Sequence, residues 1–191
     1  VFLEDLRKPK VCLPRIQRSS VIHITQISYG CNYACSYCIV RFNKGPLFSF
    51  PFELIIKDVE DAIKEGKKEI WITSQDNASY GFEGKNFVDL IEKICEIDGK
   101  FFVRIGMMNP ASLKNIFQKL VEVYKNEKIF KFLHIPLQSG SDKVLESMNR
   151  KYTTKEFLEI VEFFRKNIPE ITLSTDIIVG YPTESEEDFE K

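Results

Sequence analysis

Two hydrophobic periods alternate along this chain. Short apolar runs, rich in β-branched residues, predict strands at residues 21–27, 69–73, 101–105, 130–135 and 172–179. Between these runs, apolar residues spaced three and four apart predict helices around residues 54–63, 87–94, 113–124 and 157–164. Strands that alternate with helices in this way are typical of a parallel sheet with helices on its outer side.

Local start signals support several of these helices. Asn109, which is followed by a proline, has the pattern of an N-cap residue. Thr153 and Glu156 have the spacing of a capping box, in which each residue's side chain bonds the other's backbone N–H. Thr183 and Glu186 repeat that spacing and predict the start of a last helix.

Polar or special residues follow each predicted strand, at positions 31–38, 74–76, 109, 138–140 and 180–184. A barrel-like sheet brings the carboxyl ends of all its strands to one rim, where the chemistry of such folds lies. An open doubly wound sheet gathers only the clusters near its switch point. We therefore favour a partial (β/α) barrel, a parallel curved sheet with outer helices, over the open alternative.

Composition changes this picture little. Of the 191 residues 43% are hydrophobic and 29% charged, and the formal net charge is −1, so no polyelectrolyte surface for nucleic acid is indicated. No apolar run has membrane-spanning length and no secretory signal is visible, which predicts a cytoplasmic protein. The chain ends inside a predicted helix, so we expect a fragment: residues 1–20 a linker from a missing N-terminal domain, residues 21–191 a C-terminally truncated core domain.

The candidate chemistry lies in one loop. Cys31, Cys35 and Cys38 are spaced C-x3-C-x2-C directly after the first predicted strand. Three thiolates on one loop can each bind one iron of a cubane cluster. The fourth iron is then left open to an external ligand. The alternative is a zinc site, which needs a fourth ligand; the candidates are Cys12, Cys95, His23 and His134, and none of them forms a second pair.

Through the three cysteines and the aromatic Tyr37, the sequence resembles the radical S-adenosylmethionine (SAM) superfamily. Within it, the sequence is similar to the tRNA methylthiotransferases. The resemblance runs from about residue 21 to residue 191 and is supported by residues 74–81 (SQDNASYG), 104–110 (RIGMMNP), 133–142 (LHIPLQSGSD), 148–152 (MNRKY) and 176–184 (DIIVGYPTE). The sequence GMMNP, and Phe50 before a proline, resemble the archaeal and eukaryotic branch.

The resemblance implies a 4Fe-4S cluster, bound by the three cysteines, that cleaves SAM to a 5′-deoxyadenosyl radical. The implied reaction is 2-methylthiolation of N6-threonylcarbamoyladenosine at position 37 of tRNA, with isopentenyl adenosine as the runner-up substrate. The implied partners are the tRNA anticodon loop, bound mainly through domains absent here, and an electron donor protein; no membrane partner is implied. A second 4Fe-4S cluster is expected only in the missing N-terminal domain, since residues 1–20 contain a single cysteine.

The resemblance also implies a set of SAM-binding positions. Most of them have a plain structural alternative: a core aromatic at Tyr37, a helix start at Gln138, an N-cap at Ser139 or Ser141, a turn glycine at Gly180, a structural carboxylate at Asp176 and pairing with a neighbouring acid at Arg104. Surface or RNA-phosphate contacts are expected for Arg41, Lys44 and Arg150. The implied SAM-binding set is Tyr37, Gln75, Arg104, Gln138, Ser139, Asp176 and Gly180.

Two competing interpretations remain open at this stage. One is a zinc-stabilised RNA-binding module without redox chemistry. The other is an inactive fragment with an incomplete barrel. Even under the favoured interpretation, the chain alone is expected to generate the radical without completing sulfur transfer.

Overall fold

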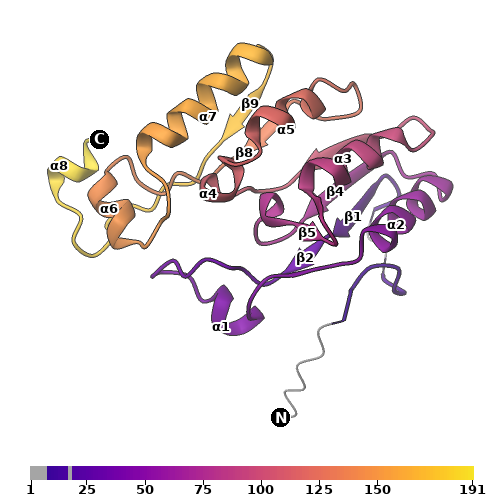
Figure 1. Ribbon diagram of the computed structural model, residues 1–191, viewed down its shortest axis with the longest axis horizontal. Coiled ribbons are helices and arrows are strands. Elements are labelled where there is room, and N and C mark those ends of the chain that lie inside the picture. The colour runs from indigo at the N-terminus through magenta and orange to yellow at the C-terminus, as the bar shows by residue number, and fades with distance from the viewer. Residues whose placement is uncertain (1–7, 17–18) are drawn as a thin grey trace, which may run out of the picture.

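A computed structural model of the chain describes residues 8–16 and 19–191 (Figure 1). Part of the predicted linker, residues 1–7 and 17–18, lies outside the described residues. The five predicted strands are confirmed, each within a few residues of its expected range. They are β1 (Ile22–Gln26), β4 (Glu69–Thr73), β7 (Phe102–Ile105), β8 (Phe132–His134) and β9 (Thr172–Ser174).

These strands are parallel neighbours in chain order. β1, β4 and β7 form a three-stranded sheet, and β8 pairs with β9. The two sheets meet where a single bridge joins Val103 to Ile129 and where the Met108 N–H donates to the His134 carbonyl at 3.0 Å. The observed architecture is the predicted partial (β/α) barrel. Across the described residues its strands do not close into a full barrel.

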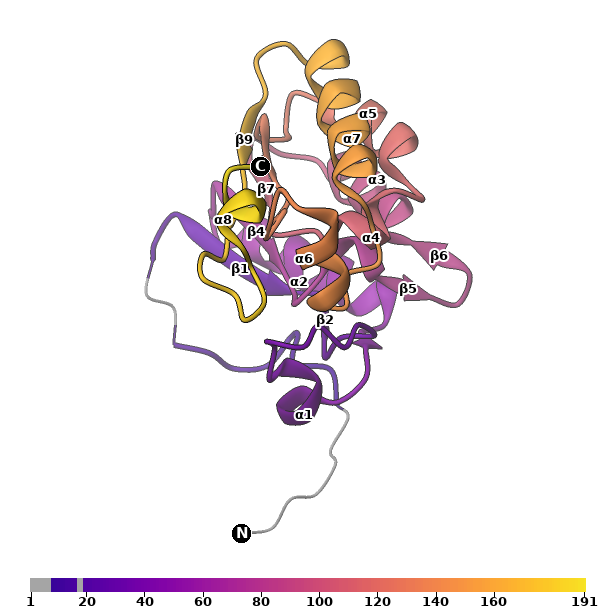
Figure 2. The same ribbon diagram turned by 90° about the vertical axis from the view of Figure 1, so that its left-hand side faces the viewer.

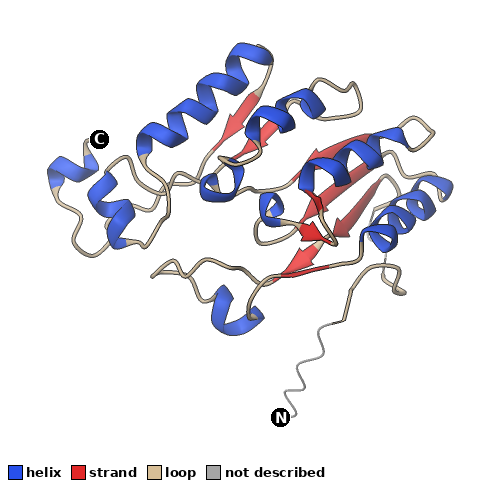
Figure 3. Cartoon of the chain, in the orientation of Figure 1, coloured by secondary structure: helices blue, strands red, loops and turns tan. Residues whose placement is uncertain are grey.

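The larger helices all pack on one side of the strands (Figures 2 and 3). They are α2 (Phe52–Lys64), α3 (Phe87–Glu96), α5 (Phe117–Tyr124) and α7 (Thr154–Asn167). Strand residues that face these helices, such as Ile70, Val103 and Leu133, are fully buried. On the other face of the sheet, Ile24 and Phe102 are 53% and 50% exposed. The apolar core therefore lies between sheet and helices, and the second sheet face is open.

Shorter elements connect these units. Two antiparallel hairpins, which the sequence did not predict, form from β2 (Ser28–Tyr29) with β3 (Phe48–Ser49) and from β5 (Gly81–Phe82) with β6 (Lys85–Asn86). The remaining helical segments are α1 (Val40–Lys44), η1 (Asn77–Ser79), α4 (Pro110–Leu113), α6 (Asp142–Ser147) and α8 (Glu186–Phe189). Among the described residues, no helix combines the length and the apolar character needed to cross a bilayer.

The helix start signals were correct at two places and wrong at one. The Asn109 side chain caps α4, and Thr153 with Glu156 forms the predicted capping box of α7. The second predicted capping box is wrong, because α8 is capped by Ser185 with Asp188 instead. Thr183 has a φ of 85°, which takes the chain through one more turn before the helix begins.

A buried carboxylate on α2 joins three segments of the chain. Asp58 accepts hydrogen bonds from the Thr25 hydroxyl of β1 at 3.0 Å and the Cys12 N–H at 3.0 Å, and it contacts His23 Nε2 at 2.9 Å. Arg15 forms an ion pair with the same carboxylate. Burial raises the pKa of Asp58, but the hydrogen bonds from His23 and Cys12 and the charge of Arg15 outweigh burial and lower the pKa below its usual value.

Replacement of Asp58 by alanine is expected to lower the free energy of unfolding by about 3 kcal/mol, because it leaves a buried histidine and a guanidinium without their partner. Since the folded-state pKa is lowered, the contribution of Asp58 is present above the unfolded pKa, about 3.9, and is lost as the pH falls below it. Urea unfolding at two pH values measures both effects. The matched control is Asp61→Ala on the exposed side of α2, expected to cost under about 0.5 kcal/mol; equal losses for both variants would contradict this role of Asp58.

Candidate functional site

The carboxyl ends of the strands surround one cavity of about 250 Å³. The loop after β1 and β2 contributes all three clustered cysteines, and the segments after β4, β7, β8 and β9 each contribute polar residues. This convergence is the arrangement that a barrel-like rim predicts. The lining residues are Cys31, Cys35, Tyr37, Cys38, Val40, Gln75, Met107, Asn109, Pro136, Gln138, Arg150 and Asp176.

The cysteine loop is held at both ends by backbone bonds. The hairpin of β2 and β3 closes its base, and the Cys31 N–H donates to the Gly45 carbonyl at 3.2 Å. At its tip, the Ser36 N–H donates to the Met148 carbonyl at 3.1 Å. Gly30 has a φ of 77°, and a Cβ there would lie 2.2 Å from the Pro46 carbonyl oxygen. Only glycine fits at this entry to the loop.

Two N–H groups point at cysteine sulfurs. The Tyr33 N–H donates to Cys31 Sγ at 3.4 Å, and Arg150 Nη1 donates to Cys35 Sγ at 3.3 Å. Burial raises the pKa of the Cys31 thiol, and the Tyr33 N–H lowers it by less. A thiol with a raised pKa stays protonated at neutral pH until a metal displaces its proton. The loop therefore places three thiols at one cavity, with two hydrogen bonds that would stabilise negative charge on the sulfurs.

The cavity fits a three-cysteine cluster better than a single zinc ion. A structural zinc site closes with four protein ligands. A cubane instead takes each of three thiolates on a different iron. The fourth zinc ligands proposed from the sequence (Cys12, Cys95, His23 and His134) are all absent from the cavity lining.

One wall of the cavity carries an acceptor without a partner. Gln75 Oε1 is buried and makes no hydrogen bond within the described structure. A buried amide oxygen without a donor is costly, and such groups are normally satisfied by a ligand or water. Gln75 therefore offers a hydrogen-bond acceptor to a molecule that enters the cavity beside the cysteines.

Four of the predicted SAM-binding residues line this cavity: Tyr37, Gln75, Gln138 and Asp176. Tyr37 is 39% exposed, so it is not a core aromatic. Gln138 has a φ of 77° and its N–H donates to the Asp176 carbonyl at 2.8 Å, which links the ends of β8 and β9. His134 Nε2 lies 2.9 Å from Asp176 Oδ2 and holds that carboxylate at the cavity edge.

Three predicted residues lie outside the lining. Ser139 is buried, and its hydroxyl accepts from the Ser141 N–H at 3.1 Å within a local turn. Gly180 has a φ of 73° and donates its N–H to Glu184 Oε2 at 2.6 Å, as a turn glycine does. Arg104 lies on the open face of the sheet, not in the cavity.

The sequence interpretation missed Arg150, which it treated as surface or RNA-binding charge. The guanidinium is directed into the site: besides Cys35, it donates to the Tyr37 hydroxyl at 3.3 Å and to Asn109 Oδ1 at 3.2 Å. Arg150 follows α6 and reaches the cysteine loop only because the chain folds back there. No local pattern indicates this approach, although the quoted stretch 148–152 contains the residue.

A second missed residue is Asp76, a fully buried carboxylate. It accepts hydrogen bonds from the Ser112 hydroxyl at 2.6 Å and the Asn109 N–H at 2.9 Å, while Ser112 also contacts the Tyr33 hydroxyl at 2.8 Å. Burial raises the pKa of Asp76 more than these hydrogen bonds lower it. The carboxylate thereby ties the ends of β4 and β7 to the cysteine loop.

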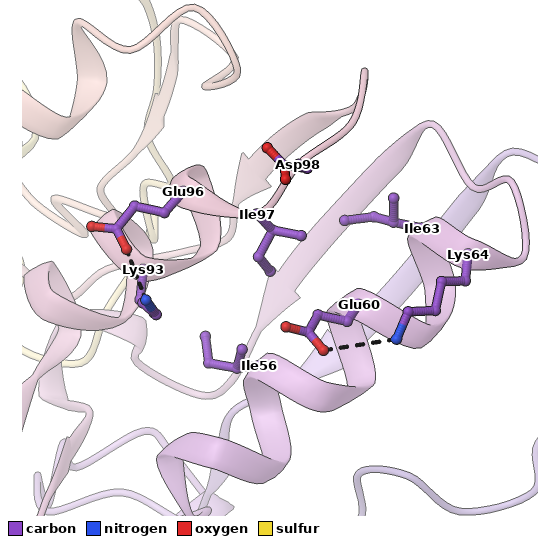
Figure 4. A pocket seen from close by; sticks show the side chains of 8 residues that line it. All are labelled: Ile56, Glu60, Ile63, Lys64, Lys93, Glu96, Ile97 and Asp98. Carbon is purple, nitrogen blue, oxygen red and sulfur yellow. Dashed lines mark hydrogen bonds and ion pairs between the residues drawn. The ribbon is translucent and has the colours of Figure 1, made fainter.

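A larger hollow, of about 440 Å³, lies between α2 and α3 on the helical side (Figure 4). Four of its five charged side chains are paired: Glu60 lies 3.9 Å from Lys64, and Lys93 lies 2.8 Å from Glu96. It shares no residue with the cysteine cavity. Size alone therefore does not make it the reactive site.

Comparisons with known proteins agree with the motif analysis. The sequence profile of the Radical SAM superfamily matches residues 25–191. The chain is 50% identical over 181 residues to a "probable threonylcarbamoyladenosine tRNA methylthiotransferase" of Methanothermobacter thermautotrophicus, covering 94% of this chain and 43% of that protein. It is 39% identical over 181 residues to a threonylcarbamoyladenosine tRNA methylthiotransferase of Drosophila pseudoobscura pseudoobscura, covering 94% of this chain and 33% of that protein. The chain thus spans less than half the length of these relatives.

Solved structures agree at the level of fold. The radical SAM methyltransferase TsrM from Kitasatospora setae, with tryptophan and a SAM analogue bound, superposes with a TM-score of 0.70 at 13% identity, over 88% of this chain and 32% of that protein. The cobalamin-dependent SAM radical enzyme OxsB, with SAM and aqua-cobalamin bound, gives a TM-score of 0.65 at 16% identity, over 81% of this chain and 23% of that protein. At these identities the likeness concerns the fold.

Proposed function

This chain belongs to the radical SAM superfamily, and from that premise we propose that it is the SAM-cleaving core of a tRNA methylthiotransferase. The observation that carries the proposal is the single cavity lined by Cys31, Cys35 and Cys38 together with an unpartnered glutamine oxygen. The proposed substrate is N6-threonylcarbamoyladenosine at position 37 of tRNA. Threonylcarbamoyladenosine is the nucleoside in the name of the relative that is 50% identical to this chain.

The three cysteines would hold a 4Fe-4S cluster through one iron each, which leaves the fourth iron for SAM. With both bound, the cluster supplies the electron that splits SAM into methionine and a 5′-deoxyadenosyl radical. The protein would hold and orient the components. Arg150 and the Tyr33 N–H stabilise charge on the sulfurs, and His134 keeps Asp176 at the cavity edge.

We assign the SAM contacts to the four predicted residues that line the cavity. Gln75 and Gln138 would hydrogen-bond its polar groups, Tyr37 would pack on an apolar face, and Asp176 would accept from a hydroxyl or ammonium. Ser139 and Gly180 would act indirectly, by shaping the turns after β8 and β9.

Residues 21–191 are proposed as the core domain, with residues 1–20 as a linker from a preceding domain that holds a second cluster and delivers sulfur. The tRNA anticodon loop and an electron donor are the proposed partners. The near-neutral charge of this chain fits phosphate binding by other parts of the protein. The chain by itself is accordingly expected to cleave SAM but not to complete methylthiolation.

Anaerobic reconstitution with iron and sulfide, followed by reductant and SAM, tests this proposal. The expected result is about four irons per chain and formation of 5′-deoxyadenosine. The natural full-length protein should then add a methylthio group to tRNA that carries threonylcarbamoyladenosine and not to tRNA that carries isopentenyl adenosine. Stoichiometric zinc without SAM cleavage would instead support a zinc-stabilised module, and methylthiolation by the isolated chain would refute the division of labour.

A further inference from the structure

The open face of the sheet carries an arginine held between two aromatic rings. The guanidinium carbon of Arg104 lies 4.9 Å from the ring centre of Trp71 and 4.5 Å from that of Phe132. The three residues come from adjacent strands: Trp71 is the register partner of Arg104, and Phe132 lies on β8. We call Trp71, Arg104 and Phe132 the arginine stack.

The fold places the arginine stack opposite the helices. Strand side chains alternate between the two faces of a sheet. The neighbours Ile70, Ile105 and Leu133 are fully buried in the core beneath the helices. Trp71, Arg104 and Phe132 are only half-buried, so they lie on the face that a ligand can reach.

The hydrogen-bonding groups of Arg104 are unused. Within the described residues its guanidinium makes no hydrogen bond and no ion pair, and it packs against the two rings. The nearby carboxylate of Glu69 accepts instead from Trp71 Nε1 at 2.9 Å. A guanidinium has five N–H donors in a planar fork that matches a carboxylate in two parallel bonds. The two rings hold the guanidinium in position before any ligand arrives.

The arginine stack adjoins the cysteine cavity along two strands. On β8, the Phe132 ring centre lies 6.4 Å from that of His134, which contacts the cavity residue Asp176 at 2.9 Å. After β7, Met107, three residues along the chain from Arg104, lines the cavity. A molecule seated at the cavity can therefore extend an arm over the sheet to Arg104.

We propose that Arg104 is the specificity-determining residue that binds the carboxylate of the threonylcarbamoyl side chain. This inference rests on the proposed function. The threonylcarbamoyl group ends in a carboxylate, whereas an isopentenyl group is an uncharged hydrocarbon. A guanidinium with unused donors can hydrogen-bond the carboxylate but not the hydrocarbon. It therefore discriminates between the two nucleosides.

The test compares Arg104→Gln with the matched control Lys155→Gln, an exposed residue on α7, both in the natural full-length protein. Titration calorimetry measures binding of an anticodon stem-loop RNA that carries threonylcarbamoyladenosine, as the free acid and as its methyl ester. The unmodified protein is expected to bind the acid roughly 10- to 100-fold more tightly than the ester. Arg104→Gln should remove that preference and leave ester binding unchanged, while Lys155→Gln should keep it.

A separate readout distinguishes this inference from the proposed function. SAM cleavage without RNA should be unchanged in Arg104→Gln, since the arginine stack lies outside the cysteine cavity. Equal binding of acid and ester by the unmodified protein, or equal loss of both in Arg104→Gln, would overturn the inference even if tRNA is methylthiolated. Loss of SAM cleavage in Arg104→Gln would assign the arginine to SAM instead. Failure of the unmodified protein to methylthiolate tRNA would refute the proposed function itself.

Discussion

Replacement of Cys31 by alanine is expected to abolish cluster binding and SAM cleavage. Cys31, Cys35 and Cys38 line one cavity, and a cubane held by three thiolates has no spare protein ligand. Iron content should fall from about four per chain to below about one after anaerobic reconstitution. Formation of 5′-deoxyadenosine should fall by more than about 10³-fold, because the cofactor carries the chemistry.

The control for this experiment is Cys95→Ala. Cys95 is a half-buried residue of α3 whose pKa is raised to about 11 by burial, and it lies outside the cavity. This variant should retain iron and SAM cleavage. Cys31→Ala should unfold within about 1 kcal/mol of the unmodified protein, since it changes one partly exposed thiol. Full iron content in Cys31→Ala would refute the assignment of the ligands.

The course of the five strands was predictable because each is a short apolar run whose burial the sequence encodes directly. Ile70 and Ile72 of β4 show this, since both are buried under the helices. The rim position of the cysteines followed from topology alone, because parallel strands all end at one edge. These features depend on residue type and chain order, both of which the sequence contains.

The details of the site were less predictable, because they depend on loop geometry. Gln138 and Thr183 adopt positive φ values of 77° and 85°, which a sequence pattern does not predict for these residue types. The second value moved the start of α8 from the expected capping box to Ser185. Whether a rim residue points into the cavity, as Gln138 does and Ser139 does not, follows from such local turns.

Contacts between distant segments were the least predictable feature. Arg150 reaches Cys35 across 115 positions of sequence, and Tyr33 meets Ser112 across 79. No periodicity or motif spacing encodes such pairs. The sequence therefore indicated which loops form the candidate site, and the fold showed which side chains meet there.

Arg150 is the residue for which this difference has the largest functional consequence. Its guanidinium donates to Cys35 Sγ at 3.3 Å and to Asn109 Oδ1 at 3.2 Å, and its carbon lies 4.8 Å from the Tyr152 ring centre. Hydrogen bonds to cluster sulfurs and the charge beside them set the reduction potential of an iron–sulfur site. A positive charge at Cys35 favours the reduced, more negative state of the cluster.

Replacement of Arg150 by methionine is therefore expected to keep about four irons per chain while making the reduction potential more negative. SAM cleavage should fall by roughly 10- to 100-fold, as is typical when a residue behind a metal ligand is removed. Arg150→Lys should restore the charge and part of the potential but not the fork that joins Cys35 to Asn109. The control is Arg165→Met on the exposed side of α7, expected to change neither quantity. Potentiometric titration and the rate of 5′-deoxyadenosine formation measure both effects. An unchanged potential in Arg150→Met would mean that Arg150 only packs against the cysteine loop.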